Sequence, residues 1–175
     1  MIRARTIAVA LAVVAAGTLV ACSDSESKAK LYDRAPVPAV PDATAAVPAT
    51  GTLPDGQYWA DMAEVVDGNI ELTLMQAFFG PSCVAALGEE ECPNDYGVQL
   101  EPSVTMRVMA DSTLTATVAA DSGQNYVVFG DELATLVGGG QPASSAPEGY
   151  TYVPFPFLVT IAGGTVTELH QIWVP

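Results

Sequence analysis

Basic residues are scarce in this chain of 175 residues, which has 6 lysines and arginines against 20 aspartates and glutamates. Beyond Gly51 the only one is Arg107. Nucleic-acid affinity comes mainly from lysines and arginines that displace counterions from phosphates, so this composition excludes a nucleic-acid partner. The acidic balance suits the solubility of an exported protein, or the attraction of cations and basic polymers.

Histidine is almost absent as well, since His170 is the only one. A Ser-His-Asp hydrolase needs a histidine beside its serine, and the chain has no Gly-x-Ser-x-Gly motif. The glycines at 138–140 follow an expected helix and do not lead into one, so they lack the helix N-terminus of a phosphate site. The sequence therefore indicates no catalytic residue, no cofactor and no metal, and favours a structural place for His170.

Long apolar runs are missing too, because none reaches the roughly 20 residues of a membrane-spanning helix. The apolar stretch 7–19 follows two arginines and leads into Leu-Val-Ala-Cys at 19–22, the layout of an export signal. These four residues resemble the lipobox of bacterial lipoproteins. The resemblance implies cleavage behind Ala21 and acylation of the Cys22 sulfur, with palmitate or a similar chain. An uncleaved anchor and a chance cysteine are the alternatives.

The segment that follows, residues 22–50, holds four prolines among alanine, valine and threonine. This composition predicts an extended, disordered tether, with a proline-rich ligand for a partner protein as the alternative. The chain then divides into a signal peptide (1–21), the lipidated cysteine with its tether (22–50) and one folded domain (51–175). Two or more acyl chains hold a protein firmly, so the lipid predicts the outer face of the cell membrane as the location.

Only two other cysteines are present, Cys83 and Cys92. An even pair in an exported protein predicts a disulfide, which would close a short loop. A metal site is the alternative, but one histidine and no further cysteine would have to complete it. The spacing also differs from the C-x-x-C of redox pairs.

Apolar residues alternate with polar ones in the segments 70–75, 104–108 and 114–118, the period-2 pattern of half-buried strands. Asp67-Gly68 and Gly163-Gly164 separate pairs of such segments and predict tight hairpins, because their turns need positive φ.

Helical patterns are confined to two short places. Residues 76–90 contain one, interrupted by Gly80-Pro81, with Ser82 as its expected cap. Asp131 to Val137 is the other, capped by Asp131 and followed by a flexible surface loop over 138–149. The predicted fold is mainly β (β-rich α+β): a single small antiparallel barrel or sandwich of six to eight strands, with one or two short helices.

Aromatic residues gather in the first and last segments of the predicted domain. If these segments pair in the sheet, Trp59, Tyr152, Phe155 and Trp173 would form an apolar or sugar-stacking binding face. The alternative is that they build the wall and rim of the core.

Three segments carry a resemblance to a loose group of uncharacterised actinobacterial surface lipoproteins: LPDGQYWADMAEV (53–65), CPNDYGV (92–98) and YVPFPFLVTIAGGTVTELHQIWVP (152–175). The shared motifs are structural. The resemblance implies lipid attachment and a β-rich fold and assigns no activity. The cysteine pair 83/92 departs from the group pattern, as does Gly97, where an aromatic residue is common.

The expected function is a lipid-anchored envelope protein whose domain is a non-catalytic binding or structural module, with an envelope ligand or a protein as partner. The alternative is a hydrolase of envelope polysaccharide that uses a pair of carboxylates. Sixteen acidic residues follow Gly51, so no single pair stands out. Calcium binding by Glu89-Glu90-Glu91 with Asn94 and Asp95 lacks EF-hand spacing, so an acidic surface turn is favoured.

Overall fold

The computed structural model describes residues 28–41, 44–49 and 51–174. The elements of these residues are β1 (Arg34–Ala35), β2 (Gly56–Val66), β3 (Asn69–Phe79), α1 (Pro81–Leu87), two 3-10 turns η1 (Glu89–Glu91) and η2 (Pro93–Asp95), β4 (Tyr96–Met109), β5 (Thr115–Ala119), β6 (Asn125–Phe129), α2 (Gly130–Val137), β7 (Phe157–Ala162) and β8 (Thr165–Gln171).

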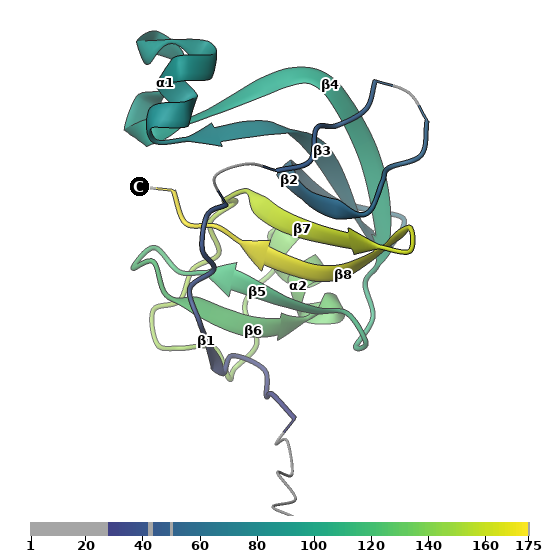
Figure 1. Cartoon of the computed structure of the whole chain (residues 1–175). Coiled ribbons are helices and arrows are strands. Elements are labelled where there is room, and N and C mark those ends of the chain that lie inside the picture. Colours follow the sequence, from purple (N-terminus) through teal and green to yellow (C-terminus); the bar gives the residue numbers. More distant parts are fainter. Residues whose placement is uncertain (1–27, 42–43, 50, 175) are drawn as a thin grey trace, which may run out of the picture.

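The described strands form one sheet of eight, in the order β1-β6-β5-β8-β7-β2-β3-β4 (Figure 1). The predicted class, a mainly β domain of six to eight strands with two short helices, is confirmed. Two details differ from the expectation. The sheet is mixed, since β5 and β8 pair in parallel, and it stays open and sandwich-like because β1 and β4 are free edges.

Both predicted hairpins are present. Asp67 and Gly68, with φ of 51° and 76°, join β2 to β3, and Gly163 and Gly164, with φ of 60° and 76°, join β7 to β8. Two consecutive residues with a left-handed backbone conformation form a turn whose twist matches that of the two strands it connects. The turn residues therefore set the pairing next to each turn, and an irregularity shifts the register farther along each hairpin.

The main core lies inside the curl of the sheet. Alternate residues of the strands enter it, and α2 adds Leu133 and Leu136 from one side. The main-core residues with no exposed surface are Tyr58, Ala60, Ile70, Leu72, Leu74, Val118, Val128, Leu133, Val159 and Leu169. A smaller apolar cluster uses the opposite face of the same strands, because neighbouring residues of a strand point to opposite sides; it contains Trp59, Ala77, Leu158 and Ile172.

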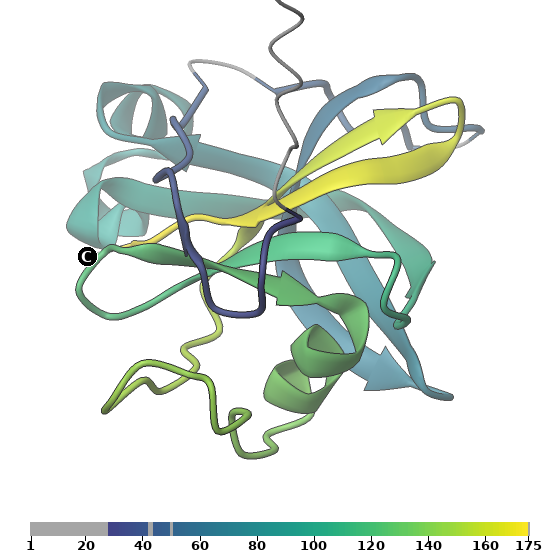
Figure 2. The ribbon, with the colours of Figure 1, turned by 90° about the horizontal axis from the view of Figure 1, so that it is seen from below.

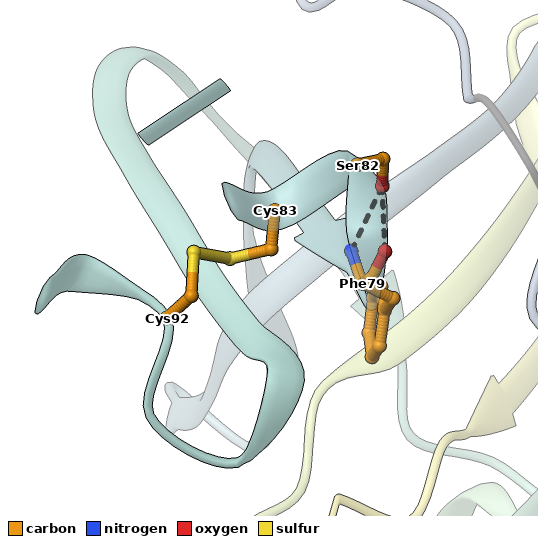
Figure 3. The surroundings of a disulfide bond; sticks show 4 residues. All are labelled: Phe79, Ser82, Cys83 and Cys92. Carbon is orange, nitrogen blue, oxygen red and sulfur yellow. Dashed lines mark hydrogen bonds between the residues drawn. A yellow bond between two sulfur atoms is a disulfide. The ribbon is translucent and has the colours of Figure 1, made fainter. Parts of the chain in front are cut away.

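The first predicted helix is shorter than expected. Residues 76–79 continue β3 and pair with β4, from Gln76 opposite Gln99 to Phe79 opposite Tyr96, because the sheet ladder outweighs a weak helical pattern. The prediction that Ser82 caps this helix was also wrong. Its hydroxyl donates to the carbonyl of Phe79 (2.6 Å) and Gly80 is the N-cap residue (Figure 3).

The predicted disulfide between Cys83 and Cys92 is confirmed, with both cysteines buried and their Cα atoms 5.9 Å apart (Figure 3). It joins α1 to the turns before β4. Gly97 lies directly beneath this loop, where an added Cβ would lie 2.5 Å from the carbonyl oxygen of Glu91 and 2.9 Å from the sulfur of Cys83. The loop therefore needs glycine at position 97, where an aromatic residue would not fit.

The predicted helix over 131–137 is confirmed as α2, which begins at Gly130 and is followed by Gly138. Asp131 does not cap it. The N-cap position belongs to Phe129, whose side chain makes no cap hydrogen bond, and the Asp131 carboxylate accepts from the N–H of Glu132 (2.9 Å) inside the first turn. The loop after α2 runs past β5 and β6 before the chain enters β7 (Figures 1 and 2).

The expected tether is wrong for the part of it that the structure describes. Tyr32 and Val47 are 6% and 4% exposed and belong to the main core. β1 pairs with the edge of β6, with Ala35 opposite Asn125, and Tyr32 N–H donates to Val127 O (2.7 Å). A few apolar side chains and edge hydrogen bonds are enough to dock a segment whose composition looks disordered. The folded unit thus begins near residue 30 and not at 51.

The predicted signal peptide (1–21) and Cys22 lie outside the described residues. Within the described ranges, the helices are all too short or too polar to span a bilayer.

Candidate functional site

The structure separates the four aromatic residues predicted to form one binding face. Trp59 is 2% exposed and packs on Phe79, with ring centroids 4.6 Å apart. It belongs to the smaller apolar cluster and lines a cavity of about 340 Å³ with Ala77 and Phe79, apart from the other three aromatic residues. The reason lies in the pairing, since β2 pairs with β7 and sets Trp59 opposite Leu158, inside the covered part of the sheet.

Trp173 lies elsewhere, near the turn between β5 and β6. It is 37% exposed, and its indole N–H donates to the carbonyl of Asp121 (3.0 Å). Tyr152 and Phe155 are half-buried and do come together, in a pocket of about 260 Å³ that we name the Tyr152–Phe155 pocket. Its walls are Asp61, Met62, Ala63 and Glu64 of β2, Val137 of α2, and Tyr152, Pro154 and Phe155.

The pocket exists because β2 leaves β7 partway along its length. The pairing of β2 with β7 ends at Ala60 opposite Phe157, and a bulge between Ala60 and Met62 interrupts its ladder with β3. A bulge bends its strand and re-aims the side chains around it. The segment 152–155 fills the space that β7 leaves, next to the first residues after the bulge.

A fully buried glutamine holds this segment in place. The side-chain N–H groups of Gln171 donate to the carbonyls of Val153 (2.7 Å) and Phe155 (3.0 Å), and its oxygen accepts from the N–H of Ala119 (2.9 Å). Gln171 has no exposed surface. Three satisfied hydrogen bonds in the interior fix the backbone that carries Tyr152 and Phe155, so the pocket walls are preorganised.

The electrostatics of the pocket come from carboxylates and neutral phenols. Asp61 accepts a 2.5 Å hydrogen bond from the hydroxyl of Tyr96. Burial, reinforced by this bond to Asp61, raises the pKa of Tyr96 far above its ordinary range, so Tyr96 remains a donor. Burial also raises the pKa of Tyr152, to about 12. Glu64 is exposed at the rim, and none of the described residues that line the pocket is basic.

This arrangement suits a ligand with an apolar face and several hydroxyl groups. Aromatic rings pack against the C–H face of such a ligand, and carboxylates accept hydrogen bonds from its hydroxyls. The volume lies just below the range of about 300–1,000 Å³ that holds most small-molecule ligands, so it suits a single ring. Anionic ligands are disfavoured because both charged lining residues, Asp61 and Glu64, are negative.

The sequence did not single out Asp61 or Glu64. Both are ordinary acidic residues in a predicted strand, among sixteen carboxylates after Gly51. Their place in the pocket depends on the bulge and on a segment about 90 residues away, and no local pattern in the sequence reports either.

His170 lines a different cavity, of about 340 Å³, together with Thr117, Leu158, Gln57 and three residues of the N-terminal segment, Pro36, Pro38 and Ala39. Its Nδ1 lies 3.0 Å from the hydroxyl oxygen of Thr117, across the parallel pair of β5 and β8. Thr117 also accepts from the side-chain amide of Asn125 (3.2 Å). None of the described residues lining this cavity is a carboxylate, so the contacts tie strands together and do not form a Ser-His-Asp type of triad.

The acidic stretch Glu89–Glu91, which was considered as a calcium site, forms the exposed turn η1 beside the disulfide. The ranges described by the structure contain no group of three His, Cys, Asp or Glu side chains placed to hold a metal ion. Comparison of the chain with protein-family models, with curated proteins and with solved structures gave no match.

Proposed function

We propose that this protein is a non-catalytic binding module of the cell envelope, anchored through an acylated Cys22 to the outer face of the membrane, and that its Tyr152–Phe155 pocket binds a sugar unit of an envelope saccharide. The observation that carries the ligand class is the meeting of Tyr152 and Phe155 with the carboxylates of Asp61 and Glu64 in one small pocket. Aromatic faces and hydrogen-bond acceptors are the two features that sugar rings require.

The location rests on the sequence features of the N-terminus and on the disulfide. The apolar stretch 7–19 and the Leu-Val-Ala-Cys sequence at 19–22 support export and lipidation. The likeness to actinobacterial surface lipoproteins points the same way. A buried disulfide between Cys83 and Cys92 suits an oxidising compartment outside the cytoplasm.

The docking of the N-terminal segment changes where the domain would sit. Packing against the domain begins at Leu31 and Tyr32, so only eight residues separate it from Cys22. Even a fully extended chain spans at most about 3.5 Å per residue, or about 30 Å in all. With Cys22 in the membrane, the domain is therefore held close to the membrane surface, where it would meet saccharides near the bilayer.

Binding of oligosaccharides tests the proposal directly. The probe is a set of soluble oligosaccharides released from the cell envelope, titrated by calorimetry into the full chain in a polyoxyethylene detergent, which contains no sugar. Phe155→Ala removes one aromatic wall and is expected to weaken binding about tenfold, because an aromatic contact contributes about 0.5–1.5 kcal/mol beyond the area it buries. Leu100→Ala is the control, since Leu100 is 69% exposed and lies outside the pocket. Equal affinity of the two variants would contradict the proposal.

A second function, hydrolysis of the same saccharides, is favoured by one observation: Asp61 and Glu64 both line the pocket. Glycosidases use two carboxyl groups, one as acid and one as base or nucleophile. Release of reducing ends from the same oligosaccharides separates the two functions. Hydrolysis requires that Glu64→Gln abolish release while binding persists, whereas a binding module releases nothing in either form.

A further inference from the structure

Another cavity, of about 550 Å³, lies at the other end of the loop that follows α2. One wall is the turn between β5 and β6, with Asp121 and Ser122, and Tyr126 of β6 adds to it. The opposite wall is the segment Pro147 to Thr151, which contains Glu148 and Tyr150. We name this cavity the Tyr126–Tyr150 pocket. Figures 1 and 2 show this loop running beside the β5–β6 pair.

Both walls are fixed by backbone hydrogen bonds. In the first, Gly123 N–H donates to Ala120 O (2.8 Å), and the indole of Trp173 holds the carbonyl of Asp121. In the second, Tyr150 N–H donates to Pro147 O (3.0 Å). A ligand therefore finds the pocket already formed and does not have to order either turn.

The tyrosines at the pocket are arranged edge to face. The rings of Tyr126 and Tyr150 have centroids 6.0 Å apart and planes at 81°. Tyr32 stands behind them, with its centroid 5.4 Å from that of Tyr150 at 65°. Rings packed at right angles present their faces in different directions, and the face of each ring carries the negative part of its quadrupole. Such a corner attracts a cation placed against it.

Tyr150 also stays uncharged. Burial raises the pKa of Tyr150 well above its ordinary value, and Tyr152 and Glu132 nearby add to this effect. The hydroxyl of Tyr150 is itself buried, so the surface that this residue gives to the pocket is carbon and backbone and not the hydroxyl group.

Charge around the pocket has one sign. Asp121 and Glu148 are exposed at its rim, and none of the described lining residues is basic. Arg34 lies opposite Tyr126 in the β1–β6 ladder but does not line the pocket. Carboxylates at the rim and aromatic rings in the wall are the combination that recognises organic ammonium groups, because the carboxylates attract the charge and the ring faces carry the negative part of the quadrupole.

We propose that the Tyr126–Tyr150 pocket is a binding site for an organic cation, an alkylammonium group that lies against the tyrosine corner with its charge toward Asp121 and Glu148. This site shares no lining residue with the Tyr152–Phe155 pocket, although Thr151 and Val153 of the same segment line it. It does not depend on the saccharide proposal. The ammonium group belongs either to a small molecule or to a lysine side chain, and the probes below distinguish these sources.

The test uses choline and its neutral isostere 3,3-dimethyl-1-butanol, in which carbon replaces the ammonium nitrogen. Each is titrated into the ¹⁵N-labelled full chain in polyoxyethylene detergent and followed by ¹H–¹⁵N NMR. Choline is expected to shift the signals of residues 120–123, 126 and 147–151 and to bind at least about tenfold more tightly than the isostere, because a cation–π contact contributes about 0.5–2 kcal/mol. N-acetyl-lysine amide is the third probe, and tighter binding than choline identifies a lysine side chain as the source.

Two variants that change the charge near the pocket in opposite directions test the electrostatic contribution to choline binding. Glu148→Gln is expected to weaken choline binding about threefold, and Arg34→Gln to leave it equal or slightly stronger, because exposed charges act through screened attraction and repulsion. Tyr126→Leu removes one ring and is expected to reduce binding to that of the neutral isostere. Leu100→Ala, at an exposed residue outside both pockets, should bind choline like the unaltered chain. A dispersed spectrum of each variant would show that it is folded.

Three results would overturn the proposal: no shifts at these residues with any ammonium probe, equal affinity for choline and its isostere, or unchanged binding in both Glu148→Gln and Tyr126→Leu. A loss of saccharide binding in Phe155→Ala with choline binding intact would show that the two pockets act independently.

Discussion

The hydroxyl of Tyr32 donates a 2.5 Å hydrogen bond to the carboxylate of Glu132 on α2. The same carboxylate oxygen accepts from the backbone N–H of Ala143 (2.8 Å), in the loop after the helix. One oxygen atom therefore joins the N-terminal segment, α2 and the loop. Burial, and then the bond to Glu132, raise the pKa of Tyr32 far above its ordinary value, so the phenol remains the donor.

Tyr32→Phe is expected to lower the free energy of unfolding by about 1–2 kcal/mol, because a hydrogen bond to a charged group is lost while the ring remains buried. Urea unfolding followed by circular dichroism measures this. Tyr126→Phe is the matched control, since the hydroxyl of Tyr126 makes no side-chain hydrogen bond with the described residues. Equal midpoints for the two variants would show that the contact contributes nothing.

Removal of the N-terminal segment tests whether it belongs to the domain. A chain of residues 51–175 loses the buried side chains of Tyr32 and Val47 as well as β1. Each buried side chain contributes about 1.5–3 kcal/mol, so the shortened chain is expected to be less stable by about 3–6 kcal/mol than residues 28–175. Thermal unfolding and limited proteolysis compare the two. The same melting temperature for both would restore the expectation of an independent tether.

Gly97→Ala tests the close approach beneath the disulfide. The new methyl group would lie 2.5 Å from the carbonyl oxygen of Glu91, a backbone atom that cannot rotate away. Overpacking of this kind costs about 1–3 kcal/mol. The exposed Gln99, in the same strand, is the control as Gln99→Ala. In urea unfolding with the disulfide kept oxidised, Gly97→Ala is expected to have a clearly lower midpoint than Gln99→Ala.

Alkaline pH is expected to unfold the domain. Burial is the largest cause of a raised pKa in five tyrosines: Tyr32, Tyr58, Tyr96, Tyr150 and Tyr152. The unfolded chain ionises near pH 10, whereas Tyr152 in the folded chain ionises near 12. The folded state thus holds its protons longer, and this contribution to stability is full below pH 10 and falls as the pH rises from about 10 to 12.

Absorbance at 295 nm, which reports tyrosinate, and far-ultraviolet circular dichroism follow this transition together. Ionisation and loss of the β signal should coincide. Tyrosinate formation near pH 10 with the β signal unchanged would mean that these phenols are accessible in the folded state.

The lipid anchor is tested by the intact mass of the protein extracted from membranes. Cleavage before Cys22 and acylation of its sulfur predict a mass that lacks residues 1–21 and gains the acyl chains. Cys22→Ala should leave the protein in the unprocessed form or release it from the membrane, because the acyl chains supply nearly all of the membrane affinity. A bare Cys22 in a mature chain would remove the proposed location.

Pairs of residues close together in the sequence were predictable. The two hairpins follow from Asp67-Gly68 and Gly163-Gly164, whose left-handed backbone only a few residue types adopt easily. The disulfide was predictable because Cys83 and Cys92 are the only cysteines besides Cys22. The failures lie where a long-range contact decides between local options. Residues 76–79 extended a strand because β4 was available to pair with them, and Trp59 is buried because Phe79 and the rest of the smaller apolar cluster pack against it.

The sequence placed Tyr152 and Phe155 in one face, and the structure brings these two together, but neither pocket as a whole could be predicted. Asp61 and Tyr152 meet through a bulge and a buried glutamine, and Tyr126 and Tyr150 meet through two turns on different segments. Neither meeting has a signature in composition, periodicity or spacing, because each depends on which strands are neighbours in the sheet.

By itself, the sequence determined the class of this protein: a mainly β domain, two glycine hairpins, one disulfide and an acidic surface, since period-2 patterning, turn residues and charge act within a few residues of one another. Only the tertiary structure decided that the N-terminal segment docks, that β5 and β8 pair in parallel, and which aromatic residues face solvent. The free energy of these choices comes from burial and hydrogen bonds between residues far apart in the chain, and it exists only once the whole sheet has formed.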